Sequence, residues 1–122
     1  MVTIDDVREV VSGLPRSYEA LVRSRVKFRV GQIVYLAFSP DEEIMGFAFP
    51  KVEREGLVDG EPHKFVMPTG GDLRYNWVLV RLAELDHQEM RELVLDAWAM
   101  VVPKSVAAKY FASIGIEPDP EG

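Results

Sequence analysis

At 122 residues the chain is long enough to form one domain with its own hydrophobic core. Hydrophobic residues make up 48% of it and charged residues 28%, a balance typical of soluble globular proteins. The sequence contains no cysteine, which excludes disulfides, thiolate metal sites and cysteine nucleophiles. No apolar run approaches the ~18 residues of a membrane span, and no signal-peptide pattern precedes the first helix. We therefore expect a cytoplasmic protein.

The net charge of −6 argues against indiscriminate binding to polyanions. The charges are nevertheless separated along the chain. Residues 16–29 contain five bases and one acid, whereas residues 39–61 contain seven acids and two bases. An acidic protein of this kind can still carry a local cationic surface.

The first predicted element is a helix over residues 4–12. Thr3 is a favourable N-cap residue, and Gly13-Leu14-Pro15 ends the helix. Apolar residues follow helical spacing between these limits: Ile4, Val7, Val10, Val11 and Leu14. We interpret the acids Asp5, Asp6 and Glu9 as complements of the helix dipole rather than as a metal site.

A hairpin is predicted next, because two β-type runs flank Gly31-Gln32, which suits a type II′ turn. The turn fixes a register with two faces. The expected core face pairs Val30 with Ile33, Phe28 with Tyr35, and Val26 with Ala37. The expected solvent face pairs Arg29 with Val34, Lys27 with Leu36, and Arg25 with Phe38. The preceding connector, residues 16–24, carries no clear signal.

The remaining elements follow from periodicity and turn residues. After a turn at 39–43, we expect a strand over 44–49, a short helix from Pro50 to Gly60, a short strand over 64–67, a flexible loop over 68–72, and helices over 87–102 and 105–114. Residues 117–122 contain two prolines and three acids and are predicted to form a disordered acidic tail.

The longest β-type run is Arg74–Leu82. Alternation places Tyr75, Trp77, Leu79 and Arg81 on one side, with Arg74, Asn76, Val78, Val80 and Leu82 on the other. The order helix, antiparallel strands, helix predicts one α+β domain over residues 1–116. In this two-layer sandwich, the N- and C-terminal helices pack on one face of an antiparallel sheet.

No catalytic constellation is recognisable. The sequence has no HExxH, GxSxG or Walker A motif, and His63 and His87 are predicted to be surface residues. Asp41-Glu42-Glu43 lacks the alternating spacing of a calcium loop. We therefore predict a protein that is not an enzyme and that has no metal site and no cofactor.

The cationic side of the hairpin strand is the main functional candidate. Arg25, Lys27 and Arg29 alternate with apolar residues, and Arg74 and Tyr75 precede the tryptophan strand. Basic residues interleaved with aromatics suit nucleic-acid backbones and exposed bases. The alternative is that these cations are the solvated side of an amphipathic strand.

Four segments in order resemble the MmcQ/YjbR family of small bacterial proteins. They are Gly13-Leu14-Pro15, the hairpin VKFRVGQIVYLAF, the strand Trp77-x-x-Val80-Arg81-Leu82, and Val101-Val102-Pro103-Lys104. The resemblance extends from Thr3 to Phe111 and implies a CyaY-like (frataxin-like) α+β fold. The family is described as DNA-binding through paired wings of the sheet. The frataxin kinship would imply iron at an acidic first helix, where this chain has only Asp5, Asp6 and Glu9.

Many family members carry a lysine-rich segment before the tryptophan strand, where this chain has a single cation, Arg74. We therefore expect weak DNA binding with little sequence selectivity, through Arg25, Lys27, Arg29, Arg74 and Tyr75. The acidic segment 41–61 is expected to face away from the DNA. The alternative is a non-enzymatic module that binds a protein partner or a small ligand on the open sheet face.

Overall fold

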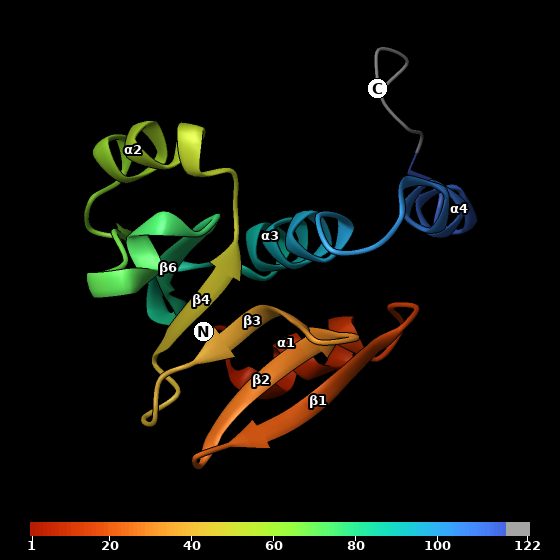
Figure 1. Ribbon diagram of the computed structural model, residues 1–122, viewed down its shortest axis with the longest axis horizontal. Coiled ribbons are helices and arrows are strands. Elements are labelled where there is room, and N and C mark those ends of the chain that lie inside the picture. The colour runs from red at the N-terminus through yellow and green to blue at the C-terminus, as the bar shows by residue number, and fades with distance from the viewer. Residues whose placement is uncertain (117–122) are drawn as a thin grey trace.

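The computed structural model describes residues 1–116, and the predicted acidic tail 117–122 lies outside the described residues (Figure 1). Its strands form one antiparallel sheet in the order β1-β2-β3-β4-β6-β5. They span Ser17–Val22 (β1), Arg25–Val30 (β2), Ile33–Phe38 (β3), Ile44–Ala48 (β4), Phe65–Val66 (β5) and Trp77–Arg81 (β6). The α-helices span Ile4–Val11 (α1), Lys51–Gly60 (α2), His87–Ala99 (α3) and Lys104–Ser113 (α4), and 3₁₀ helices cover Gly70–Arg74 (η1) and Leu82–Glu84 (η2).

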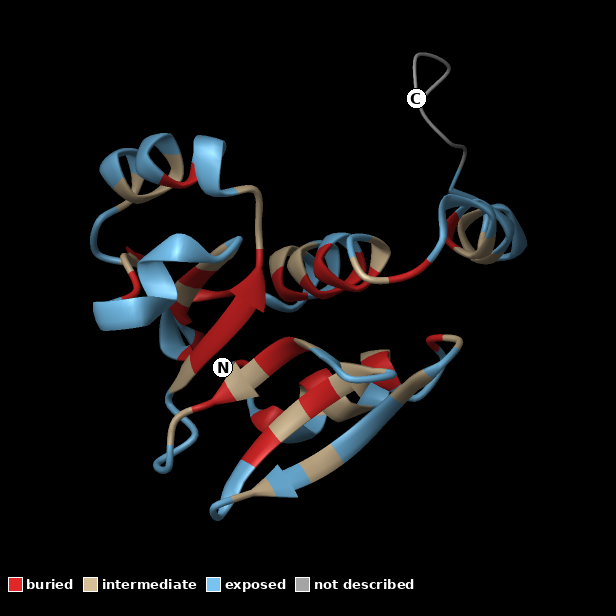
Figure 2. Ribbon diagram, viewed as in Figure 1, coloured by how far each residue is buried: buried red, intermediate tan, exposed pale blue. Residues whose placement is uncertain are grey.

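One face of the sheet is covered by α1 and α3, which also contact each other. Their apolar stripes and the strand residues that face them form one core (Figure 2). Val7, Val11, Val94, Ala97 and Trp98 are buried in this core, and Val10 and Leu93 pack against it. This arrangement confirms the predicted α+β class with both helices on one face.

Trp98 ties the C-terminal helices to the N-terminal part of the chain. Its indole Nε1 donates a hydrogen bond to the carbonyl of Pro15 at 2.9 Å, although the ring itself is fully buried. The rings of Tyr110 and Phe111 on α4 meet the indole edge to face, at centroid distances of 5.2 and 5.9 Å. Pro103 therefore separates two helices that share one aromatic cluster.

The alternation predicted for the tryptophan strand is confirmed. Val78, Val80 and Leu82 are buried on the helix side, whereas Trp77 and Leu79 are half-buried and Arg81 is exposed. The strand itself is shorter than expected, because η1 ends at Arg74, Tyr75 caps it and Asn76 lies in a bend before Trp77. β6 pairs with β4 on one side and with the two-residue β5 on the other.

The hairpin register is right at the turn and wrong beyond it. Val30 pairs with Ile33 and Arg29 with Val34 as predicted, but Phe28 then pairs with Leu36 and Lys27 with Ala37. Tyr35 is the extra residue of a β-bulge, which shifts every later pair by one position. Consequently Leu36 and Phe38, predicted to face solvent, are buried, and Ala37 faces the open side. Ile33, predicted to be core, is 54% exposed.

The bulge residue has a structural role of its own. Tyr35 is fully buried, and its hydroxyl shares a 2.5 Å hydrogen bond with Ser17 on β1. Burial raises the pKa of Tyr35 to about 12, so its phenol is neutral over the ordinary pH range. The extra bend also separates β3 from β4. Only Leu36–Phe38 pair with Met45–Phe47, and the two strands diverge beyond these residues (Figure 1).

The connector without a predicted structure contains the edge strand β1. Its pairing with β2 requires a two-residue turn at Arg23-Ser24, where both residues have positive φ (53° and 65°). Asparagine and glycine favour this conformation, and arginine and serine do not. The turn is therefore imposed by strand pairing rather than by local preference.

This strain predicts that Ser24→Gly stabilises the protein. Relief of a left-handed conformation should raise the free energy of unfolding by about 1 kcal/mol, as measured by urea denaturation. Ser12→Gly is the matched control, because Ser12 has a right-handed φ of −58° and gains nothing from glycine. Equal effects of the two substitutions on the urea midpoint would contradict this account.

Candidate functional site

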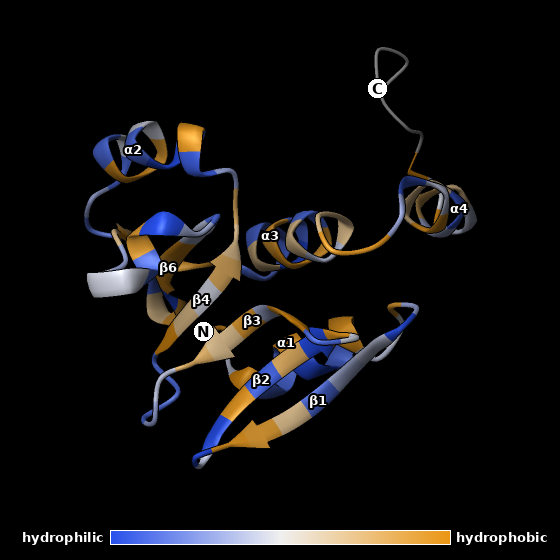
Figure 3. Cartoon of the chain, viewed as in Figure 1, coloured by the Kyte–Doolittle hydropathy of each residue, from blue (hydrophilic) through white to orange (hydrophobic). Residues whose placement is uncertain are grey.

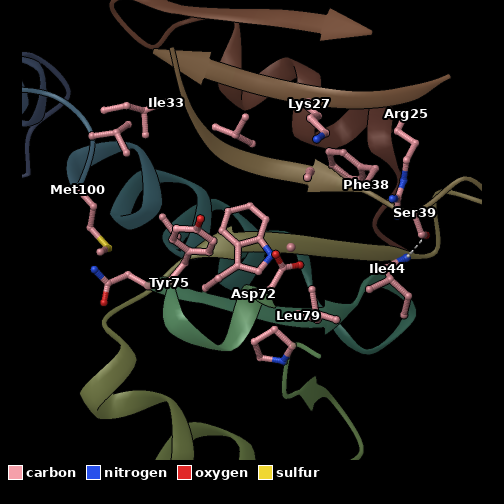
Figure 4. Close-up of a pocket in the computed structure, with 18 of the residues that line it drawn as sticks. Arg25, Lys27, Ile33, Phe38, Ser39, Ile44, Asp72, Tyr75, Leu79 and Met100 are labelled. Carbon is pink, nitrogen blue, oxygen red and sulfur yellow. Dashed lines mark hydrogen bonds between the residues drawn. The ribbon is translucent and has the colours of Figure 1, made fainter. Parts of the chain in front are cut away.

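The sheet face opposite α1 and α3 carries an open groove of about 820 Å³ (Figure 4). β2, β3, β4 and β6 line it together with the segment 68–76. Met100 and Val101, which follow α3, reach the same groove. It lies where β3 and β4 diverge, so the bulge at Tyr35 helps to create it.

Small residues form the floor of the groove. Ala37, Gly46 and Ala48 occupy neighbouring positions on β3 and β4. The indole of Trp77 lies against Gly46 so closely that a β-carbon at residue 46 would be 2.5 Å from Cζ2 and 2.7 Å from Nε1. Only glycine permits this contact, and Trp77 thereby becomes part of the floor.

A buried arginine is hydrogen-bonded to residues 73–77, which form the rim of the groove on the β6 side. Arg54 on α2 is only 6% exposed, although α2 is otherwise largely hydrophilic (Figure 3). Its guanidinium donates hydrogen bonds of 2.9, 3.1 and 3.0 Å to the carbonyls of Leu73, Tyr75 and Trp77. The fixed fork of an arginine suits several acceptors at once. The segment predicted to be a flexible loop, residues 68–72, therefore overlaps η1, a 3₁₀ helix that Arg54 anchors at its C-terminal end.

A second contact fixes the same rim. The side-chain oxygen of Asn76 accepts a hydrogen bond from the backbone N–H of Lys51 at 2.9 Å. Lys51 also donates from Nζ to the carbonyl of Arg74 at 3.3 Å. The start of α2 and the approach to β6 are thus joined, and Asp72 and Tyr75 are presented along one side of the groove (Figure 4).

Of the five predicted nucleic-acid-binding residues, three meet in the groove. Arg25, Lys27 and Tyr75 line it, with Tyr75 56% exposed. Arg29 continues the row on β2 but does not line the groove. Its Nε atom is buried and has no hydrogen-bond partner among residues 1–116. Arg74 also lies outside the lining, with its guanidinium carbon 5.2 Å from the ring centroid of Tyr75.

Sequence reasoning missed other lining residues. Gly46 interrupts an apolar strand, which is a recognisable sign of close backbone approach. Asp72 was interpreted only as part of a loop, yet its carboxylate lies at the groove (Figure 4). Nothing in the sequence indicates that Met100 lines the groove, because its position depends on how α3 ends relative to the sheet. Arg54, which supports the groove without lining it, has no signal of its own, because other charged residues surround it in the sequence.

The acidic segment 41–61 was expected to face away from the binding surface, but part of it lies beside the groove. Ser39 and Ile44 line the groove, so the acidic turn between β3 and β4 borders it. Asp41 is fixed in that turn, where its carboxylate accepts from the Ser39 hydroxyl at 2.6 Å and from the Glu43 N–H at 3.0 Å. These hydrogen bonds lower the pKa of Asp41. Negative charge therefore lies beside the groove that carries Arg25 and Lys27.

The acids of the first helix have local partners. Asp6 closes the capping box with Thr3 and lies 3.2 Å from His87, and its hydrogen bonds to Thr3 lower its pKa. Asp5 pairs with Arg8 at 2.9 Å. Within residues 1–116 no group of three or more histidine, aspartate or glutamate side chains is arranged to hold a metal ion. No helix in this range is both long and apolar enough to cross a bilayer.

The fold and groove define a small α+β protein with an open, aromatic-floored sheet face. The YjbR family matches residues 12–100, and the chain belongs to this family. This confirms the resemblance seen in the sequence. The uncharacterised protein Rv2570 of Mycobacterium tuberculosis is 31% identical over 137 residues, which cover 94% of this chain and 100% of that protein. Uncharacterised protein Mb2600 of Mycobacterium bovis matches equally well.

A solved structure shares the fold. The crystal structure of Deinococcus radiodurans protein DR2400, with a domain named DUF419, superposes with a TM-score of 0.74. The match covers 100% of this chain and 94% of that protein at 22% identity. At this identity the likeness establishes the architecture alone.

The contact between Trp77 and Gly46 predicts an asymmetry between two glycines. Gly46→Ala should displace the indole and lower the free energy of unfolding by about 1–3 kcal/mol. Gly56→Ala is the matched control, because Gly56 lies within α2 with open space around it. That control should stabilise the protein by about 0.5–1 kcal/mol through helix propensity. Urea denaturation measures both, and the account is wrong if Gly46→Ala is neutral.

Proposed function

We propose that this member of the YjbR family is a nucleic-acid-binding protein that contacts DNA weakly and with little sequence selectivity. One observation carries the proposal. The cations Arg25 and Lys27 share an open groove with the aromatic side chains of Tyr75 and Trp77. Cations for phosphates and aromatic faces for bases are the two components of sequence-tolerant nucleic-acid binding.

The cations are suitably spaced for a phosphate backbone. Arg25, Lys27 and Arg29 lie on the same side of β2, since Val26 and Phe28 between them are buried. Alternate residues of a strand are ~6.6–7 Å apart, which is close to the phosphate spacing along a nucleic-acid strand. Arg29 would extend the row beyond the groove itself.

Several features support weak rather than tight binding. Only a few phosphates would be neutralised. Each one contributes about −0.9 to the slope of the logarithm of the binding constant against the logarithm of the salt concentration. The acidic turn at residues 39–43 borders the groove and opposes a polyanion. Arg74 is placed against Tyr75 and would serve chiefly to hold that ring.

We propose further that the protein acts by binding and not by catalysis, without a metal or cofactor. Asp72 is the one acidic side chain among the residues that line the groove in the described part of the chain, and both histidines lie elsewhere. The lining thus offers charge and aromatic surface rather than a proton-transfer pair.

A second candidate rests on the apolar character of the groove. Val34, Ile44, Leu79 and Met100 line it beside Trp77. An apolar groove with few polar groups also suits a small ligand or a segment of a protein partner. This non-enzymatic binding module is the alternative if nucleic acid is not bound.

Titration with duplex DNA at about 50 mM and about 200 mM salt tests the proposal. The wild type should bind with micromolar or weaker affinity that falls steeply with salt. The triple substitution Arg25→Ala/Lys27→Ala/Arg29→Ala should weaken binding by about tenfold or more at low salt and flatten the salt slope.

The matched control is Arg91→Ala/Lys104→Ala/Lys109→Ala, which removes three exposed cations from α3 and α4. It changes the net charge equally and should retain most of the affinity. No salt-sensitive binding by the wild type, or equal losses in the two triple variants, would favour the second candidate.

A further inference from the structure

Building on the proposed function, we propose that the groove receives an unpaired base of a single-stranded segment. In this arrangement the base stacks on the aromatic surface formed by Trp77 and Tyr75. Asp72 then favours guanine at that position.

The position of Trp77 favours a single strand over a duplex. The indole lies against the backbone of Gly46 and also lines the groove, and Trp77 is half-buried, so part of its ring is open to a ligand. Bases in a duplex are stacked on one another and have no free face to offer such a floor. An unpaired base can enter and stack, as on the aromatic platforms that sheets present to single strands.

Tyr75 extends this surface at the rim. Its ring is 56% exposed, and the Arg74 guanidinium lies 5.2 Å from its centroid. That cation restricts the motion of the ring and leaves its remaining surface available for a second base. The hydrogen bonds from Arg54 to the carbonyls of Tyr75 and Trp77 hold both residues at their positions before any ligand arrives. Little ordering entropy would then be lost on binding.

The position of Asp72 is unexpected in a site for a polyanion. Its carboxylate would repel phosphates, yet it lies on the side of the groove that carries Tyr75, across from Arg25 and Lys27 (Figure 4). Phosphates on the β2 side would leave the base edges directed toward the Asp72 side. A carboxylate there is an acceptor only, so it selects base edges that donate.

Guanine matches this acceptor best. Its Watson–Crick edge presents the adjacent donors N1–H and N2–H₂, which suit the two oxygens of one carboxylate. Cytosine and adenine offer only an amino group beside an acceptor nitrogen. Thymine presents one N–H between two carbonyl oxygens, which the carboxylate would repel. The expected order is guanine, then cytosine and adenine, then thymine.

Fluorescence anisotropy with labelled short oligonucleotides tests strand preference first. A thymine octamer should bind the full-length protein about tenfold more tightly than a hairpin duplex at the same low salt. Tyr75→Ser, a change at an exposed side chain, and Trp77→Leu should each weaken single-strand binding by about fivefold or more. Circular dichroism of both variants checks that the fold is retained.

Asp72→Asn tests the base preference. A thymine octamer with one central guanine should bind the wild type about fivefold more tightly than the all-thymine octamer. In Asp72→Asn that ratio should fall to about one, while affinity for the all-thymine strand rises because a repulsive charge is removed. Asp59→Asn removes an equal charge at an exposed position of α2 and should leave the ratio unchanged.

The outcomes separate this inference from the proposed function. Salt-sensitive binding that is equal for duplex and single strand, and insensitive to Tyr75 and Trp77, would keep DNA binding and overturn the inference. Retention of the guanine preference in Asp72→Asn would overturn the role of Asp72. Absence of binding to every oligonucleotide would overturn both proposals.

Discussion

The contact between Trp77 and Gly46 is the constraint on which the open face of the sheet depends. A large aromatic side chain buries roughly 150–250 Å² of surface, and here the Trp77 indole contacts the backbone directly because residue 46 has no β-carbon. Arg54 fixes the backbone of the same residue, since its guanidinium donates a hydrogen bond to the carbonyl of Trp77. A buried cation is costly to desolvate, and the three carbonyls that accept from Arg54 offset that cost. The backbone on the β6 side of the groove is thus held by the Arg54 side chain, and Trp77 rests on Gly46.

The bulge at Tyr35 is the second feature that shapes the groove. It turns β3 away from β4, so that only three residues of each strand pair. Beyond these three pairs the space between the strands is not closed by backbone hydrogen bonds. Met100 and Val101 reach it from the end of α3 and give it an apolar border. Fold and candidate function are therefore linked through a single inserted residue in one strand.

Elements whose hydrophobic periodicity reflects burial could be predicted from the sequence. The edge strand and the hairpin register depend on how strands pair, and they could not. The alternation of Trp77–Arg81 and the helical stripe from Ile4 to Val11 were predicted correctly, because one face of each meets the core. β1 was missed because the Arg23-Ser24 turn has no glycine or asparagine, so its left-handed backbone leaves no local signal. The register error came from the bulge at Tyr35. Tyr35 is buried like a regular core residue, so nothing in the sequence marks it as the inserted one. The cations of β2 were identified from charge, but that Arg29 lies outside the groove and Asp72 inside it depends on tertiary packing.

We propose that the ligand binds in the groove and not on the helical face. Amide chemical-shift mapping of the ¹⁵N-labelled protein, titrated with a single-stranded oligonucleotide at low salt, tests it most directly. The account predicts that the largest shifts fall on Arg25, Lys27, Gly46, Asp72 and the Trp77 indole N–H, with the Trp98 indole N–H unchanged as an internal reference. Shifts concentrated instead on α1, α3 or α4, with the Trp77 indole unmoved, would contradict it.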